Sequence, residues 1–157
     1  VGENAVRRGV STYWQRTFWH PSLLAFDAPS REECTVERPR SNTPLQALVL
    51  LNDPTYVEAA RRFAELTIQQ GGATTEQRLA FAFQKALNRN PGEDEQTILV
   101  GLYEKHLADY QKDKASAALL AKIGYVKTAA DIDVVELAAW TSVTRVILNL
   151  HETITRY

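Results

Sequence analysis

The chain has 157 residues, of which 45% are hydrophobic and 24% are charged, and its formal net charge is −1. This composition excludes a disordered chain, and the length fits one domain over residues 1–157. The balanced charge argues against nucleic acid as a partner, and no apolar run approaches the roughly twenty residues needed for membrane insertion.

Residues 1–43 are predicted to form a long irregular N-terminal arm. Four prolines occur between residues 20 and 44, and they disfavour helices. Apolar residues within the arm favour a loop that packs rather than a free tail: Leu23, Leu24 and Phe26. Before them, four residues have the spacing of one helix face: Val10, Tyr13, Trp14 and Phe18. A short helix is therefore predicted there, although residues 11–14 are also compatible with a strand.

Two helices that begin at prolines are predicted next. Thr43 and Asp53 are suited to cap helices whose first residues are Pro44 and Pro54. The first helix, to Leu51, is apolar on nearly every side and is predicted to be buried. The second is expected to end near residue 70, before two glycines. Its inward stripe consists of Val57, Ala60, Ala64 and Ile68, and the other side carries Glu58 and Arg62.

Further helices are predicted over residues 75–88, from the turn at 88–92 to about 111, and over about 115–123. Thr74 and Gln77 can form a capping box at the first of these. Asp133 and Glu136 can cap a long C-terminal helix, in which apolar residues repeat every seven positions: Trp140, Ile147 and Ile154. The predicted fold class is all-α, a bundle of five or six helices over residues 44–157 that follows the irregular arm.

The sequence contains no recognisable catalytic motif. A phosphate-binding glycine loop, a nucleophile elbow, an HExxH zinc motif and an acidic calcium loop are all missing from the sequence. The single cysteine, Cys34, excludes an internal disulfide, and the three histidines are far apart in the sequence. No metal site and no self-sufficient active site are therefore predicted, and whether the chain forms part of an enzyme stays open.

Two groups of polar residues are candidates for a binding site. The first is a candidate site for an anion or an acidic partner near a helix N-terminus: Arg38, Arg40, Asn42 and Asp53. The favoured alternative is that the two arginines attach the arm to carboxylates or helix C-termini of the bundle. The second is a C-terminal polar cluster in which His151 is next to Glu152, and Glu152 can pair with Arg156. Structural pairing is the favoured interpretation there as well.

Several strings resemble one protein family over nearly the whole chain: residues 11–16, 23–29, 42–54 and 148–153. The string Asn42–Pro54, which reads NTPLQALVLLNDP, is the most distinctive. It resembles the C-terminal domain of unknown function of planctomycete proteins that also carry a cytochrome c-like domain. The resemblance implies that the chain is a fragment of a larger, exported multidomain protein, outside the cytoplasm. It also implies a haem on another domain, no cofactor in this segment, and the other domains of the parent chain as partners.

Three hypotheses on function follow. The first is a non-catalytic structural or interaction module of the exported protein, which predicts an exposed hydrophobic or mixed patch. The second is a part of an extracellular enzyme or redox assembly, acting for example on a polysaccharide, and it requires the two polar groups to converge on one pocket. The third is carbohydrate binding through Trp14 or Trp19.

Overall fold

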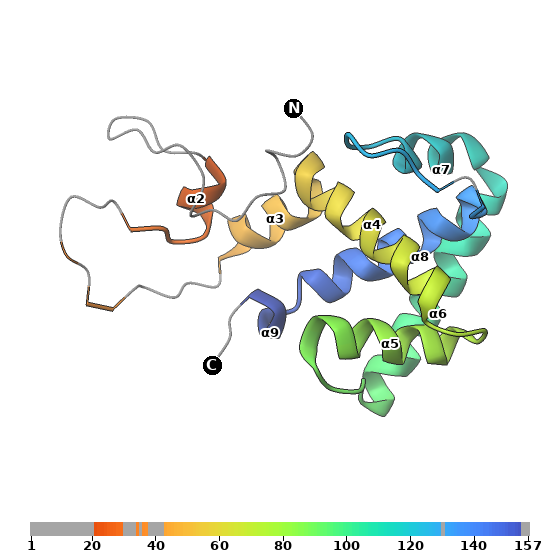
Figure 1. The fold of residues 1–157 in the computed structure, drawn as a ribbon, viewed down its shortest axis with the longest axis horizontal. Coiled ribbons are helices and arrows are strands. Elements are labelled where there is room, and N and C mark those ends of the chain that lie inside the picture. Colours follow the sequence, from red (N-terminus) through yellow and green to blue (C-terminus); the bar gives the residue numbers. More distant parts are fainter. Residues whose placement is uncertain (1–20, 30–33, 35, 38–42, 130, 155–157) are drawn as a thin grey trace.

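The computed structural model describes residues 21–29, 34, 36–37, 43–129 and 131–154, and within these ranges the chain is all-α, with no strand (Figure 1). Six helices correspond to the predicted bundle: α3 (Pro44–Asn52), α4 (Pro54–Gln70), α5 (Thr75–Leu87), α6 (Glu93–Lys112), α7 (Lys114–Ala121) and α8 (Val134–Leu148). Two short helices, α2 (Pro21–Ala25) and α9 (His151–Ile154), flank them. The helix predicted around residues 10–18 lies outside the described residues.

The predicted helix starts are confirmed by their capping hydrogen bonds. Thr43 and Gln46 form a reciprocal capping box at α3, and Thr74 and Gln77 form another at α5. The Asp53 carboxylate accepts a hydrogen bond from the backbone of Thr55, which caps α4 directly before Pro54. Asp133 caps α8 in the same way. These caps satisfy backbone N–H groups that have no partner within the helix, and they divide the chain into separate helices.

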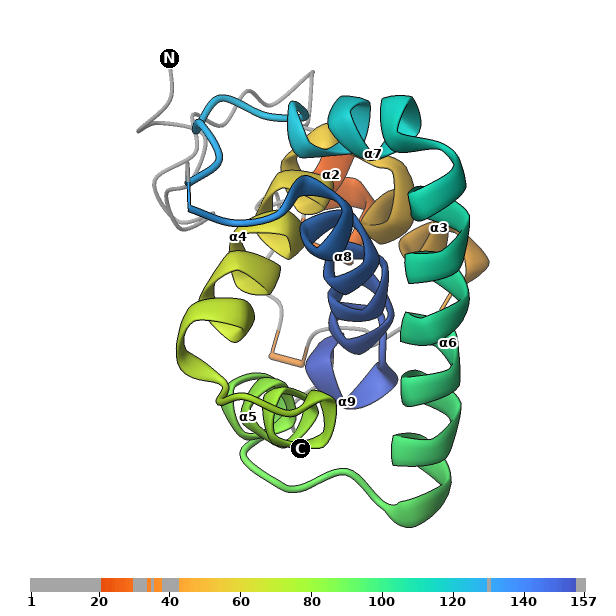
Figure 2. The same cartoon turned by 90° about the vertical axis from the view of Figure 1, so that its right-hand side faces the viewer.

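Helix α8 is the centre of the bundle. It contacts α4, α6, α7 and α5, and Figure 2 shows it between α4 and α6. Trp140 of α8 is buried, and its ring lies 4.9 Å from that of Tyr103 on α6. Much of the rest of the core comes from the facing sides of four helices: Ala64, Leu79, Phe83, Leu99, Leu137, Val143 and Ile147. Because α8 is covered on several sides, most of its residues are buried whatever their polarity.

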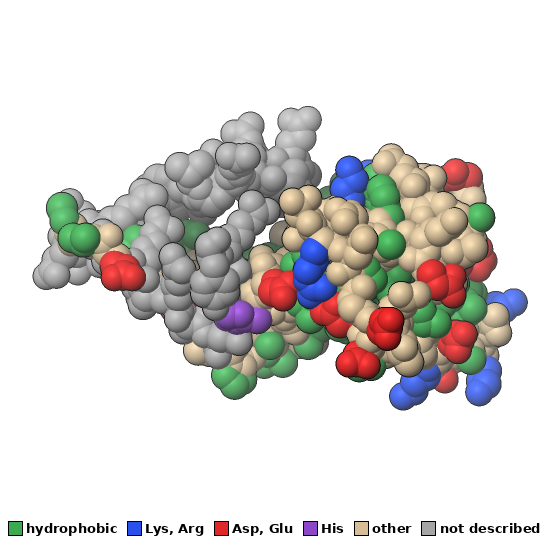
Figure 3. Space-filling model, turned by 90° about the horizontal axis from the view of Figure 1, so that it is seen from below, with side chains coloured by type: hydrophobic (Ala, Val, Ile, Leu, Met, Phe, Trp, Pro, Cys, Tyr) green, Lys and Arg blue, Asp and Glu red, His purple; other side chains and the backbone are tan. Residues whose placement is uncertain are grey.

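Helix α3 differs from its prediction. Its apolar sequence suggested a buried helix, yet Leu45 and Leu48 are each 58% exposed, and Gln46 is its only buried residue. Among the described helices its main contacts are with α2, α4 and α8. In Figure 3 hydrophobic side chains gather along the lower edge of the view, over α3. An apolar sequence shows what a helix could bury, but not whether the fold covers it on every side.

The long C-terminal helix of the prediction is also interrupted. Trp140 and Ile147 are buried as the seven-residue repeat predicts, but α8 ends at Leu148. The backbone N–H of Asn149 bonds to carbonyls of the last turn, and α9 begins at His151. Ile154 therefore does not continue the stripe of α8. Its side chain instead lines a pocket together with residues of α3, α4 and α8.

Candidate functional site

An apolar pocket lies where α3, α4, α8 and α9 meet the turn that follows α2. Its volume is about 460 Å³, which is within the range of small-molecule sites. Most of the lining is aliphatic or aromatic and comes from all five segments: Phe26, Leu50, Tyr56, Ala59, Ala60, Leu148 and Ile154. The rings of Phe26 and Tyr56 meet edge to face, with their centroids 5.8 Å apart. Thr153 and Arg145 complete the wall.

Arg145 is the charged residue of this pocket, which we call the Arg145 pocket. Its guanidinium donates a hydrogen bond to the carbonyl of Leu51, near the C-terminal end of α3. Its Nε atom is buried and has no hydrogen-bond partner. Among the described residues no carboxylate lies within 4.0 Å of the guanidinium. The pocket therefore combines an apolar wall with one positive charge, which in the described part of the chain faces a backbone carbonyl rather than a carboxylate.

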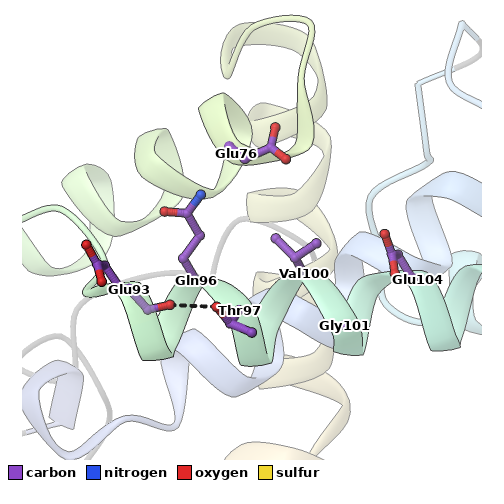
Figure 4. A pocket seen from close by; sticks show the side chains of 7 residues that line it. All are labelled: Glu76, Glu93, Gln96, Thr97, Val100, Gly101 and Glu104. Carbon is purple, nitrogen blue, oxygen red and sulfur yellow. Dashed lines mark hydrogen bonds between the residues drawn. The ribbon is translucent and has the colours of Figure 1, made fainter.

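A second, larger hollow lies between the start of α5 and the length of α6, with a volume of about 630 Å³. Figure 4 shows its three carboxylates, Glu76, Glu93 and Glu104, spread along the two helices rather than directed at one point. Gln96, Thr97, Val100 and Gly101 form the surface between them. Throughout the described ranges, no three His, Cys, Asp or Glu residues are grouped so that they could hold a metal ion. This hollow is an acidic surface without the geometry of a catalytic or metal site.

Most of the buried charge lies on α4, in a cluster we call the Arg61 cluster: Glu58, Arg61 and Glu65. The side chain of Arg61 is fully buried, and its Nη1 atom lies 2.6 Å from a carboxylate oxygen of Glu65. The guanidinium also donates to the carbonyls of Ile123 and Val126 and to the Thr128 hydroxyl. Glu58 accepts hydrogen bonds from the backbone N–H groups of Tyr125 and Val126. The cluster therefore fixes the loop between α7 and α8 to the side of α4.

This cluster corrects the prediction for Glu58. We expected Glu58 and Arg62 together on the side of α4 away from its apolar stripe, but Glu58 is only 7% exposed. Arg62 has a half-exposed side chain and pairs with Glu65 instead. The reason is that residues 123–128 cross α4 and bring backbone donors and acceptors to its polar side. That segment is more than sixty positions away in the sequence, so the spacing on α4 alone could not reveal it.

Two further ion-pair groups hold helices together. Arg78 of α5 pairs with Glu136 of α8, so the carboxylate of Glu136 is engaged across the bundle, while its backbone N–H bonds to Asp133 at the α8 cap. Arg89, in the turn before α6, bonds to both oxygens of Glu95 at 2.7 Å and to Glu152 of α9 at 2.8 Å. The bonds from Arg89, with one from the Gly92 backbone, lower the pKa of Glu95 from 4.5 to about 2. The two carboxylates raise the pKa of Arg89 above its usual range.

Three of the predicted site residues are described, and none of them lines either of the two pockets: Asp53, His151 and Glu152. Of the anion-site candidates, Arg38, Arg40 and Asn42 lie outside the described residues, and the Asp53 carboxylate caps α4. In the C-terminal cluster, His151 is exposed and Glu152 pairs with Arg89. Arg156, which was expected as the partner of Glu152, lies outside the described residues.

Sequence reasoning did not single out the Arg145 pocket. The position of Arg145 could have indicated it, because this charged residue lies within the apolar C-terminal helix, two positions before Ile147. A charged residue within a helix that is otherwise mostly apolar must be paired, bound to a backbone group or exposed. The position of its acceptor, Leu51, ninety-four residues earlier, could not be inferred in the same way.

Comparison with known protein families gives a match. Residues 1–103, more than half of the chain, match the family model described as PSD1, protein of unknown function (DUF1553). The chain belongs to this family. The match includes α3, α4, α5 and most of α6. No curated protein and no solved structure shows a significant match. The family membership confirms the expected domain of unknown function and gives it no activity.

Proposed function

We propose that this domain is a non-catalytic structural and interaction module of an exported, cytochrome c-associated multidomain protein of planctomycetes. Its partners are the other domains of the same parent chain, one of which carries the haem, and the segment itself needs no cofactor. The family membership is compatible with this role, and the sequence resemblance supplies the context of the parent protein. None of the described helices is long and apolar enough to cross a bilayer.

The observation that carries the proposal is the exposed apolar side of α3. Leu45 and Leu48 are more than half exposed, and three residues apart on a helix they share one side. They belong to the distinctive string NTPLQALVLLNDP, in which Thr43 and Gln46 form the α3 cap and Asp53 forms the α4 cap. Side chains of this size gain from burial against a partner, as in interfaces between domains of one chain.

The distribution of charge supports a module without chemistry of its own. Arg61, Arg78 and Arg89 are all paired with carboxylates within the bundle. An enzyme that acts on a polysaccharide or another bound substrate would direct such groups at a shared pocket with room for that substrate. The carbohydrate-binding alternative depends on Trp14 and Trp19, which lie outside the described residues, and no described feature favours it.

The test is binding of this chain to the remainder of its parent protein, expressed without this segment. The double variant Leu45→Glu/Leu48→Glu should weaken that binding at least about tenfold, because charges cannot be buried against an apolar partner. Ile98→Glu, on the exposed side of α6, is the matched control, since Ile98 is 68% exposed and should tolerate the charge. Equal binding of the double variant and the wild type by calorimetry would contradict the proposal.

A further inference from the structure

We propose that the Arg145 pocket binds a small amphipathic carboxylate, with the carboxylate on the Arg145 guanidinium and an aliphatic body among the apolar side chains. This goes beyond the proposed function, and neither depends on the other. Leu45 and Leu48, which carry the proposed interaction with other domains, do not line the pocket.

The wall of the Arg145 pocket is mostly apolar. Five separate segments contribute to it, and the fold brings them together around a space of about 460 Å³. Leu50, Leu148 and Ile154 are aliphatic, and Phe26 and Tyr56 add two rings that meet edge to face. Specific small-molecule sites are of this size and are mostly apolar, with a few placed polar groups that fix the orientation of the ligand. An aliphatic or aromatic body is what such a wall favours.

The guanidinium of Arg145 supplies the positive charge of the pocket. A guanidinium has five N–H donors in a planar fork. In Arg145 the hydrogen bond to the Leu51 carbonyl uses Nη2, while the buried Nε has no partner. Four other arginines of the bundle each have at least one carboxylate within 4.0 Å: Arg61, Arg62, Arg78 and Arg89. Arg145 has none among the described residues, so the side chain retains the capacity to bind a carboxylate at this wall.

The apolar wall and the charge of Arg145 together define the class of ligand. A neutral apolar ligand would fill the pocket but would further desolvate an uncompensated cation, which is unfavourable. A small inorganic anion would satisfy the charge and leave the apolar wall in water. A monocarboxylate with an aliphatic chain satisfies both parts. The acidic hollow between α5 and α6 is the opposite case, because its carboxylates would repel the same ligand.

The simpler interpretation is that Arg145 only stabilises the end of α3, as basic side chains do at helix C-termini. The two interpretations differ in what a second carboxylate would do. A purely structural arginine predicts no saturable binding of an aliphatic carboxylate and no dependence on chain length. A binding site predicts both, as well as sensitivity to the volume of the pocket.

The experiment uses the full 157-residue chain and sodium decanoate as the probe, below its micelle concentration and at neutral pH, followed by isothermal titration calorimetry. Saturable binding of one decanoate per chain is expected. Removing two CH₂ groups, in octanoate, should weaken the binding by up to about fifteenfold, which is about fourfold for each buried CH₂. Decanol, which lacks the charge, should bind at least about tenfold more weakly than decanoate.

Three variants separate the charge from the cavity. Arg145→Gln should weaken decanoate binding at least about tenfold and leave decanol binding unchanged, because the amide can still donate to Leu51. Ala59→Phe, at an exposed position of α4 that lines the pocket, should fill the cavity and weaken both probes. Lys105→Gln, an exposed residue of α6, removes a charge elsewhere and should change neither.

Several results would overturn the inference. These are the absence of saturable decanoate binding, equal decanoate affinity for the wild type and Arg145→Gln, or unchanged binding in Ala59→Phe. Loss of decanoate binding in Leu45→Glu/Leu48→Glu would also overturn it, since it would place the ligand on the exposed side of α3. Failure of the chain to bind the rest of its parent would contradict only the proposed function.

Discussion

Two arginines of this domain, Arg61 on α4 and Arg145 on α8, show how differently the same side chain can be used. Arg61 is fully buried and has two carboxylates, two backbone carbonyls and a hydroxyl around it. Arg145 lines an apolar pocket and has one backbone carbonyl. A buried guanidinium with an acceptor at each of its three nitrogens holds a fold together, because any loss leaves other groups unpaired. A charge with spare donors contributes less to the fold and can recognise a ligand.

The largest effect should come from Arg61→Ala. It would leave Glu58 buried without a cation, leave Glu65 with Arg62 alone, and remove the three hydrogen bonds from Arg61 to residues 123–128. We expect a loss of about 3–5 kcal/mol in the free energy of unfolding, measured by urea denaturation. Arg62→Ala is the control one position away, and it should cost less than about 1 kcal/mol because its side chain is half exposed.

A loss of this size could prevent folding, so a second variant keeps the test decisive. Arg61→Lys retains the charge but loses the planar fork that reaches several acceptors at once, and it should lie between Arg61→Ala and the wild type. If Arg61→Ala were no less stable than Arg62→Ala, the Arg61 cluster would not be the clamp that its hydrogen bonds indicate.

The second largest loss of stability should come from Gly124→Ala, which tests the contact between the Arg61 cluster and the loop at residues 123–128. Gly124 has a φ of +102°, and a Cβ atom there would overlap the carboxyl group of Glu58. We expect a loss of about 2 kcal/mol from strained backbone and displacement of that buried carboxylate. Gly101→Ala on α6 is the matched control: a Cβ atom would have no neighbour within 4 Å. It should stabilise the protein by about 0.5–1 kcal/mol, since alanine favours helices. Equal effects of the two substitutions on thermal unfolding would remove the close contact with Glu58 as their cause.

The features that could be predicted from the sequence are local ones. Caps at Thr43, Asp53, Thr74 and Asp133 were predictable because a cap and the groups it satisfies lie within four residues. The core side of α8 was predictable from its repeat, through Trp140 and Ile147. Each is a property of neighbouring residues, and the all-α class follows from several such properties.

The use of the charged residues was not predictable, because their partners come from distant parts of the chain. The spacing of Glu58, Arg61 and Glu65 is also that of ion pairs on an exposed helix surface. Only the crossing of residues 123–128 makes the three a buried cluster. Arg145 became part of a pocket because α9 turns back at Asn149, where the seven-residue repeat had suggested a continuous helix. The predicted sites were chosen for polar side chains that are close in sequence, and this criterion does not detect a pocket with an apolar wall.

A smaller effect on stability is expected for Arg145→Gln, and it sharpens the contrast with Arg61. Only one hydrogen bond, to the Leu51 carbonyl, is at risk, and a glutamine can replace it in part. We expect a change of less than about 1.5 kcal/mol in the free energy of unfolding. Urea denaturation of Arg145→Gln beside Arg61→Ala gives the comparison directly. A loss as large as that of Arg61→Ala would mean that Arg145 is mainly structural.

The smallest effect concerns Arg89, which has two carboxylate partners as Arg61 has, but lies at the surface. Its partner Glu95 has a pKa of about 2 in the folded protein, against 4.5 without the ion pair. A lowered pKa stabilises the fold above the unfolded value, and this contribution is lost as the pH falls from about 4.5 to about 2. Because the side chains of Arg89 and Glu95 are each 36% exposed, solvent screening should limit the contribution to less than about 1 kcal/mol.

The measurement is urea denaturation of the wild type and Glu95→Gln at several values of pH. The difference between the two proteins should be present at neutral pH, shrink below about pH 4.5 and be smaller in high salt. If Glu95→Gln lowered the free energy of unfolding as much as Arg61→Ala, burial would not explain the difference between Arg61 and Arg89. If it were absent at every pH, the bidentate pair would not exist in solution. A small, salt-sensitive difference instead means that exposure, rather than the number of carboxylate partners, sets how much an arginine stabilises this bundle.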